Sequence, residues 1–101
     1  MRYVVVAAVG LLAFAGGALA QTQDKPAFEA MCARVSTADG LPTQAIAPFC
    51  SCLADRAVTR AALYRELWDA AQAYPNRDAR MAALTPAGRE AVHACRGPAP
   101  Q

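Results

Sequence analysis

Apolar residues recur every three to four positions along most of the chain after residue 20, which is the spacing of one face of an α-helix. In the first such stretch the apolar face consists of Phe28, Met31, Cys32 and Val35. Asp24 precedes this stretch as a candidate N-cap, and Gly40 follows it as a terminator. The pattern predicts a first helix between Asp24 and Gly40.

A second helix is predicted after Leu41-Pro42. Its apolar face contains Ile46, Phe49, Cys50, Leu53 and Ala57. Pro48 complicates its start, because proline has no N–H and fits best in the first turn of a helix. Two starts therefore stay open: the helix begins near Thr43 and bends at Pro48, or Pro48 is its first residue.

The remaining segments continue the helical pattern. A third helix, with Thr59 as its candidate cap, has the strongest separation of apolar and charged faces. Its apolar face contains Leu63, Leu67, Ala70, Ala71 and Tyr74. Asn76 is a candidate cap for a short helical turn that buries Met81 and Leu84. Thr85 and Pro86 are the candidate cap and first residue of a last helix that ends at Gly97-Pro98. The chain from 21 to 101 is thus expected to form one all-α domain, a bundle of about four helices, with a loose tail from about residue 97.

Residues 1–20 have a different pattern and are expected to form a signal peptide. Arg2 precedes an unbroken apolar run, and Ala18-Leu19-Ala20 matches the small residues of a cleavage site before Gln21. A retained membrane anchor is the competing interpretation, because residues 3–20 are at the lower limit of a bilayer span. No later stretch approaches that length, so no stable membrane insertion is expected after cleavage. The expected location is the periplasm of a Gram-negative bacterium, or the medium outside it.

Composition excludes several functions. The chain has 101 residues and a formal charge of +2, and loss of residues 1–20 removes only one basic residue, Arg2. Such a balance argues against nucleic-acid binding. The single histidine and the scattered carboxyl groups form no acid–base couple, so neither an enzyme nor a cofactor is expected.

Four cysteines in an exported chain predict two disulfides. Cys50 and Cys52 are two positions apart, so on a helix they point about 200° away from each other and should reach different partners. One of them would bond Cys32 on the first helix and the other Cys95 on the last. The pairing of Cys32 with Cys52 and of Cys50 with Cys95 is slightly favoured, and the alternative, Cys32 with Cys50 and Cys52 with Cys95, stays open.

The same residues allow a different function. Cys50-x-Cys52 together with His93-x-Cys95 would offer thiol and imidazole groups for redox chemistry or for a zinc or copper ion. The divergence of residues two apart on a helix argues against both uses.

A partner-binding surface is a further possibility. Tyr64 and Trp68 lie one helical turn apart at the edge of the apolar face, where they could contact another protein or simply cover the core. Most of the arginines are scattered among carboxylates and are interpreted as a solvated surface of mixed charge. These arginines are Arg56, Arg60, Arg77, Arg80 and Arg89.

The order Cys32, Cys50-Ser51-Cys52, Cys95 resembles that of small exported helical proteins of Gram-negative bacteria that carry a C…C-x-C…C framework. This resemblance implies an all-α periplasmic domain and no particular activity. The leading expectation is a non-enzymatic protein that acts on an unknown periplasmic protein as an accessory subunit, an inhibitor or a chaperone-like factor.

Overall fold

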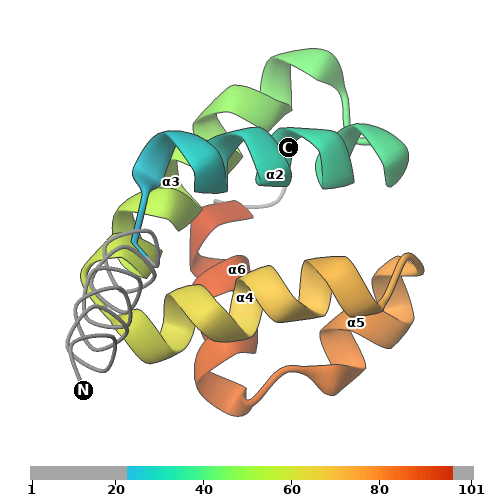
Figure 1. The fold of residues 1–101 in the computed structure, drawn as a ribbon. Helices are drawn as coiled ribbons and strands as arrows, with labels where there is room; N and C mark the ends of the chain where they lie inside the picture. Colours follow the sequence, from blue (N-terminus) through green and yellow to red (C-terminus); the bar gives the residue numbers. More distant parts are fainter. Residues whose placement is uncertain (1–22, 97–101) are drawn as a thin grey trace, which may run out of the picture.

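The computed structural model describes residues 23–96, so the expected signal peptide and the expected loose tail from residue 97 lie outside the described residues. Within residues 23–96 the chain is all-α, with five helices and no strand (Figure 1). The helices are α2 (Lys25–Ala38), α3 (Thr43–Val58), α4 (Ala61–Ala73), α5 (Arg77–Ala83) and α6 (Pro86–Arg96). The all-α prediction is confirmed, and the expected short helical turn is a separate helix, α5.

Three predicted N-caps are confirmed. The Asp24 carboxylate accepts a hydrogen bond from the N–H of Ala27 at 3.2 Å, and the Asn76 side chain accepts one from Ala79 at 2.9 Å. The Thr85 hydroxyl accepts a longer one, 3.3 Å, from Gly88. Each cap satisfies a backbone N–H that has no partner inside its helix.

The predicted cap at Thr59 is wrong. Thr59 ends α3 with helical backbone angles, and its hydroxyl donates to the carbonyl of Arg56 at 2.9 Å. The residue before α4 is Arg60, which is extended and makes no side-chain cap. Because α3 and α4 are almost contiguous, Thr59 satisfies the end of one helix and not the start of the next.

Proline and glycine set the turn between α2 and α3. Gly40 has a φ of +87°, and it ends α2 while the N–H of Leu41 reaches back to the carbonyl of Ser36 at 3.0 Å. Such a turn favours glycine because other residues are strained at positive φ. α3 then starts at Thr43 with Pro48 inside it, which is the first of the two predicted starts.

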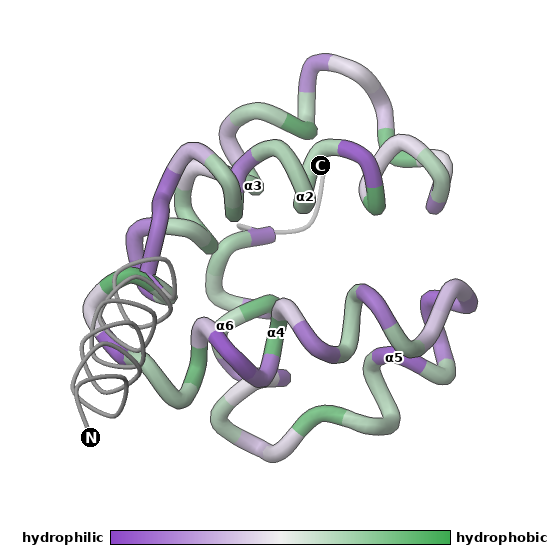
Figure 2. Tube along the Cα trace, viewed as in Figure 1, coloured by the Kyte–Doolittle hydropathy of each residue, from purple (hydrophilic) through white to green (hydrophobic). Residues whose placement is uncertain are grey.

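The core lies where α2, α3, α4 and α6 meet. α3 packs against α2, α4 and α6, and α4 also contacts α2 and α5. Phe28 of α2 is fully buried at the centre. Each helix carries both hydrophobic and hydrophilic positions (Figure 2), as helices that bury one face in a bundle do. Tyr74 departs from the predicted face of the third helix, because α4 ends one residue before it and the residue is 41% exposed.

Two disulfides fasten α3 to its neighbours. Cys32 of α2 is bonded to Cys50, and Cys95 of α6 is bonded to Cys52. The expectation that α3 reaches both neighbouring helices is confirmed, but the favoured pairing is wrong. Its error has a physical cause: Cys32 and Cys50 are both buried in the apolar faces that α2 and α3 turn toward each other, whereas Cys52 and Cys95 are half-buried at the flank.

A second fastening joins α4 to the start of α6. The Glu66 carboxylate accepts hydrogen bonds from the backbone N–H of Thr85 and, at 2.9 Å, from the Thr85 hydroxyl. It also lies against Gly88, where an added Cβ would stand 2.8 Å from the carboxylate oxygen. A negative charge at the start of a helix is stabilised by the unpaired N–H groups there. No helix within residues 23–96 is long and apolar enough to cross a bilayer.

Candidate functional site

Tyr64 belongs to the core and not to a contact surface. Its side chain is buried, with the residue 5% exposed, and its ring lies 5.1 Å from that of Phe28. Its hydroxyl donates to the carbonyl of Asp24 at 2.8 Å, which ties α4 to the start of α2. Burial raises the pKa of Tyr64, and the nearby Asp24 charge adds to this effect. The proposal of Tyr64 as a partner contact is therefore corrected.

Trp68 is the outer member of the same aromatic group. Its ring is stacked on that of Tyr64, with centroids 5.9 Å apart and planes at 10°. The side chain is half-buried against the core. The chain itself therefore covers most of the surface of Trp68, and partner binding through Trp68 stays a prediction.

The cysteine and histidine set is not assembled as a redox or metal centre. Cys50 and Cys52 are bonded to different cysteines, so neither offers a thiolate, and the same holds for Cys95. His93 is exposed on α6. Residues 23–96 contain no group of three or more histidine, cysteine or acidic side chains positioned around a metal ion.

A groove of about 500 Å³ lies where the α2–α3 turn meets α3, α5 and α6. We call it the arginine groove, because two of its lining residues are the exposed Arg77 and Arg96. Its other lining residues are Asp39, Gly40, Leu41, Pro42, Ala45, Pro48, Phe49 and Cys95. The groove therefore combines an apolar floor with two cationic side chains.

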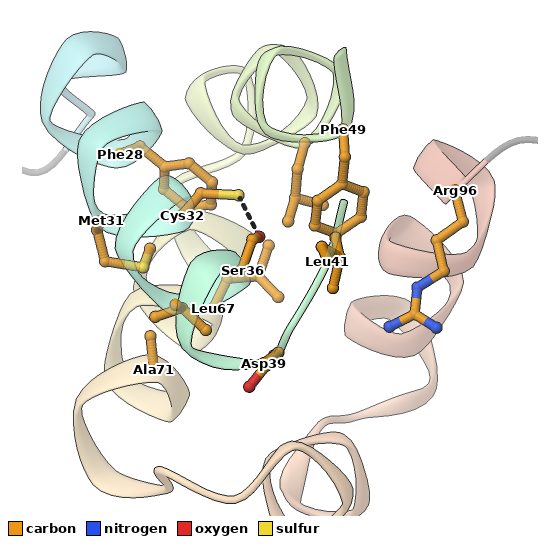
Figure 3. Close-up of a pocket in the computed structure, with 12 residues that line it drawn as sticks. Phe28, Met31, Cys32, Ser36, Asp39, Leu41, Phe49, Leu67, Ala71 and Arg96 are labelled. Carbon is orange, nitrogen blue, oxygen red and sulfur yellow. Dashed lines mark hydrogen bonds between the residues drawn. The ribbon is translucent and has the colours of Figure 1, made fainter. Parts of the chain in front are cut away.

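A smaller cavity of about 70 Å³ adjoins the groove, and we call it the inner cavity (Figure 3). The residues that line both spaces are Asp39, Leu41, Phe49 and Arg96. The deeper wall of the inner cavity is apolar and includes Phe28, Met31 and Leu67. The only uncharged polar side chain there is Ser36, which lies 3.9 Å and 3.7 Å from the sulfurs of the Cys32–Cys50 disulfide.

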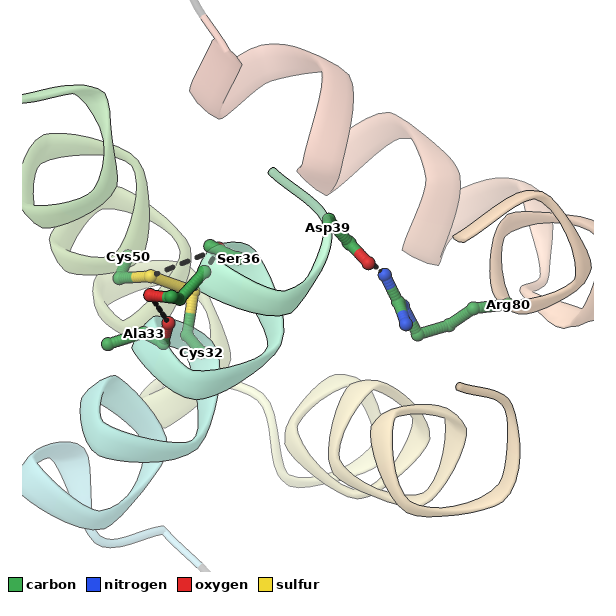
Figure 4. The surroundings of a disulfide bond; sticks show 7 residues. Cys32, Ala33, Ser36, Asp39, Cys50 and Arg80 are labelled. Atoms are coloured by element: carbon green, nitrogen blue, oxygen red, sulfur yellow. Dashed lines mark hydrogen bonds and ion pairs between the residues drawn. A yellow bond between two sulfur atoms is a disulfide. The ribbon is translucent and has the colours of Figure 1, made fainter. Parts of the chain in front are cut away.

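An ion pair braces one wall of the groove. Asp39 at the end of α2 is paired with Arg80 of α5, and the two side chains are only 10% and 12% exposed (Figure 4). Arg80 also donates to the carbonyl of Tyr74 at 3.0 Å. The interpretation of Arg80 as a solvated surface residue is thus wrong, because its guanidinium joins three segments in a low-exposure site.

The charges of the arginine groove are unbalanced. Its only acidic lining residue, Asp39, is already paired with Arg80, whereas Arg77 and Arg96 pair with no carboxylate of residues 23–96. Another groove, of about 600 Å³ between α2 and α3, has no cation, and Glu29 is its one charged residue. Of these three hollows, the arginine groove is therefore the one that has two cations beside apolar surface, neither of which pairs with a carboxylate of residues 23–96.

The sequence contained little signal for this site. Arg77 and Arg96 lie 19 positions apart and on different helices, and neither belongs to a local motif. Comparison with models of protein families, with curated proteins and with solved structures finds no match to this chain.

Proposed function

We propose that this chain is a non-enzymatic protein, exported to the periplasm, that acts by binding another protein through the arginine groove. The observation that carries this proposal is the presence of two guanidinium groups beside the apolar floor formed by Leu41 and Phe49. These groups, those of Arg77 and Arg96, pair with no carboxylate of residues 23–96. Arginine and aromatic residues contribute most to binding energy at protein interfaces.

The construction of the groove also favours binding. Its walls come from four separate segments, and the Cys52–Cys95 disulfide and the Asp39–Arg80 pair hold these segments together. A surface that is rigid before binding loses less conformational entropy when a partner docks. Export is supported by the pattern of residues 1–20 and by the use of all four cysteines in disulfides, which persist in oxidising compartments.

The test is site-specific photo-cross-linking in the producing cells. A benzophenone amino acid replaces Ala45, which lines the groove, and the adduct is identified in the periplasmic fraction. We expect one partner protein to be captured, and capture to fall at least tenfold when Arg77→Glu and Arg96→Glu are introduced together.

The matched control is Arg56→Glu with Arg65→Glu, which reverses two exposed charges outside the groove. This control should capture the partner as well as the unchanged chain does. Equal loss of capture in both double variants, or capture that neither variant alters, would refute a role for the groove. Recovery of the chain only from the cytoplasm would refute export.

A further inference from the structure

The inner cavity determines what kind of side chain a partner can insert. An apolar cavity of about 150 Å³ accepts a benzene ring. The inner cavity, at about 70 Å³, has room for a branched aliphatic tip but not for an aromatic ring. Because its deeper wall is formed by Phe28, Met31 and Leu67, an inserted aliphatic group would exchange water for close apolar contacts.

Arg96 determines which chemical group of the partner can lie beside the inserted aliphatic side chain. It lines both the inner cavity and the arginine groove, and its side chain reaches from α6 toward the space that Leu41 and Phe49 border (Figure 3). Arg77 lines the same groove from α5. A guanidinium group binds a carboxylate through two parallel hydrogen bonds. Two arginines that pair with no carboxylate of the described part of the chain therefore favour an anionic group at this place.

On the basis of the proposed function, we infer that the site recognises a chain segment in which a branched aliphatic side chain lies within two residues of a carboxylate. The aliphatic tip occupies the inner cavity, and the carboxylate lies in the groove against Arg77 and Arg96. The carboxylate can belong to an Asp or Glu side chain or to the C-terminus of the partner. A bare anion would leave the cavity unused, and a purely apolar segment would leave the two guanidinium groups unpaired.

The inference is tested with four synthetic peptides and the oxidised protein, with binding followed by two-dimensional ¹⁵N NMR titration. The first peptide is acetyl-Gly-Ser-Gly-Val with a free C-terminus, and the second is its amide. The third is the amide acetyl-Gly-Val-Glu-Ser, and the fourth replaces valine of the third by glycine. We expect shifts at Leu41, Phe49 and Arg96 with the first or the third peptide, which identifies the source of the carboxylate. Whichever of these two peptides binds, its control should bind at least tenfold more weakly. The control is the second peptide, which lacks the carboxylate, for the first, and the fourth peptide, which lacks the valine, for the third.

Protein variants test the two halves of the site separately. Arg77→Gln with Arg96→Gln should weaken the best peptide at least tenfold, whereas the exposed control pair Arg56→Gln and Arg65→Gln should not. Ala71→Leu fills the inner cavity, which Ala71 lines, and should remove the preference for valine over glycine while leaving both arginines in place. Circular dichroism and a count of free thiols verify that each variant is folded and oxidised.

Either of two results would overturn the inference: no peptide produces shifts in the groove at millimolar concentration, or binding does not depend on the valine or does not depend on the two arginines. If this happens while the cross-linker at position 45 still captures a partner that depends on Arg77 and Arg96, the proposed function stands and the ligand chemistry is wrong. If capture fails as well, the proposed function falls with it.

Discussion

The carboxylate of Glu66 on α4 binds both the backbone N–H and the hydroxyl of Thr85, the residue directly before α6. One side chain thus caps a helix that starts 20 positions later in the sequence. Replacement of Glu66 by Gln removes the charge and keeps the shape. We expect Glu66→Gln to lower the free energy of unfolding by about 1 kcal/mol, since hydrogen bonds to charged groups and charges at helix N-termini contribute more than neutral ones. Urea titration measures this change, and a loss no larger than that of Glu90→Gln, on the exposed side of α6, would contradict the capping role.

Substitution of Gly88 tests its contact with Glu66 through the sign of the change in stability. Alanine stabilises a helix interior by about 0.5–1 kcal/mol relative to glycine, so Gly88→Ala alone would normally help. Here the new Cβ would meet the Glu66 carboxylate at 2.8 Å and displace it from Thr85. We expect Gly88→Ala to give no net gain in the native sequence but a gain of about 0.5–1 kcal/mol in a Glu66→Ala background. Equal effects in the two backgrounds would contradict the steric coupling.

The half-buried disulfide should be reduced before the buried one. Reductant reaches Cys52 and Cys95 more readily than Cys32 and Cys50, which are 4% and 3% exposed. Brief treatment with dithiothreitol followed by alkylation should therefore label Cys52 and Cys95 together. Because only Ser51 separates Cys50 from Cys52, no common protease distinguishes the two pairings, and fragmentation of the labelled peptide between these residues is required. Label on Cys50 and Cys95 would contradict the pairing seen here.

Loss of the longer bridge should cost more stability. The disulfides join cysteines 18 and 43 positions apart. In the chain-entropy account, loops of these lengths contribute about 3 and about 4 kcal/mol respectively. We expect the double variant Cys52→Ala/Cys95→Ala to lose about 4 kcal/mol, measured by thermal and urea unfolding. A loss below about 1 kcal/mol would show that packing alone holds α6 in place.

The buried ion pair of Asp39 and Arg80 should contribute far more to stability than the exposed Arg77 on the same helix as Arg80. Arg80→Met leaves the Asp39 carboxylate unpaired at 10% side-chain exposure and also removes the bond to the Tyr74 carbonyl. We expect a loss of about 3 kcal/mol in the free energy of unfolding, the usual cost of an orphaned buried charge. Arg77→Met on the same helix is the control, because Arg77 is exposed and its replacement should change stability by less than about 0.5 kcal/mol.

The raised pKa of Tyr64 predicts that the protein loses stability in alkaline solution. Burial raises the pKa of its hydroxyl above the usual value of about 10, so the folded state retains the proton after the unfolded chain has lost it. The stability contributed by this group is therefore complete below about pH 10 and is lost as the pH rises through the folded pKa. The pKa of Lys25 is also raised, by its hydrogen bond to Asp55, so loss of this proton likewise reduces stability as the pH rises.

The difference between the native chain and Tyr64→Phe isolates the tyrosine. We expect the variant to be about 1 kcal/mol less stable at neutral pH, because it lacks the bond to the Asp24 carbonyl, and this gap should narrow above pH 10. Unfolding in urea at a series of pH values gives both results. Tyr74→Phe, which removes a hydroxyl at an exposed position, is the control and should change stability at neutral pH by less than about 0.5 kcal/mol.

The features that could be predicted from the sequence are those that depend on neighbouring residues. Caps at Asp24 and Asn76 and the terminating Gly40 act within four positions, so the residue types themselves identify them. The sequence does favour the Cys32–Cys50 bond in one respect, because both cysteines lie in the apolar faces of helices that are joined by a short turn. The sequence does not decide between Cys50 and Cys52 as the partner of Cys32, because the pairing depends on which side of α3 packs against α6. No local pattern specifies that side.

The arginine groove could not be predicted for the same reason. Asp39 and Arg80 lie 41 positions apart, and each is an ordinary charged residue in its own segment. Arg77 and Arg96 meet at one groove only because α5 and α6 both return toward the α2–α3 turn. Such long-range placement is determined by the packing of whole helices and not by the spacing of residues along one of them.

The order of the cysteines has a consequence for biogenesis. If the chain is exported as proposed and crosses the membrane from its N-terminus, Cys32, Cys50 and Cys52 reach the oxidising side before Cys95 does. At that stage Cys32 could bond only Cys50 or Cys52, and Cys50 is the one that is buried where α3 packs against α2. When Cys95 emerges, a single thiol remains to receive it. If the chain is exported as proposed, oxidation in order of arrival would therefore yield the two bonds of the structure, Cys32–Cys50 and Cys52–Cys95.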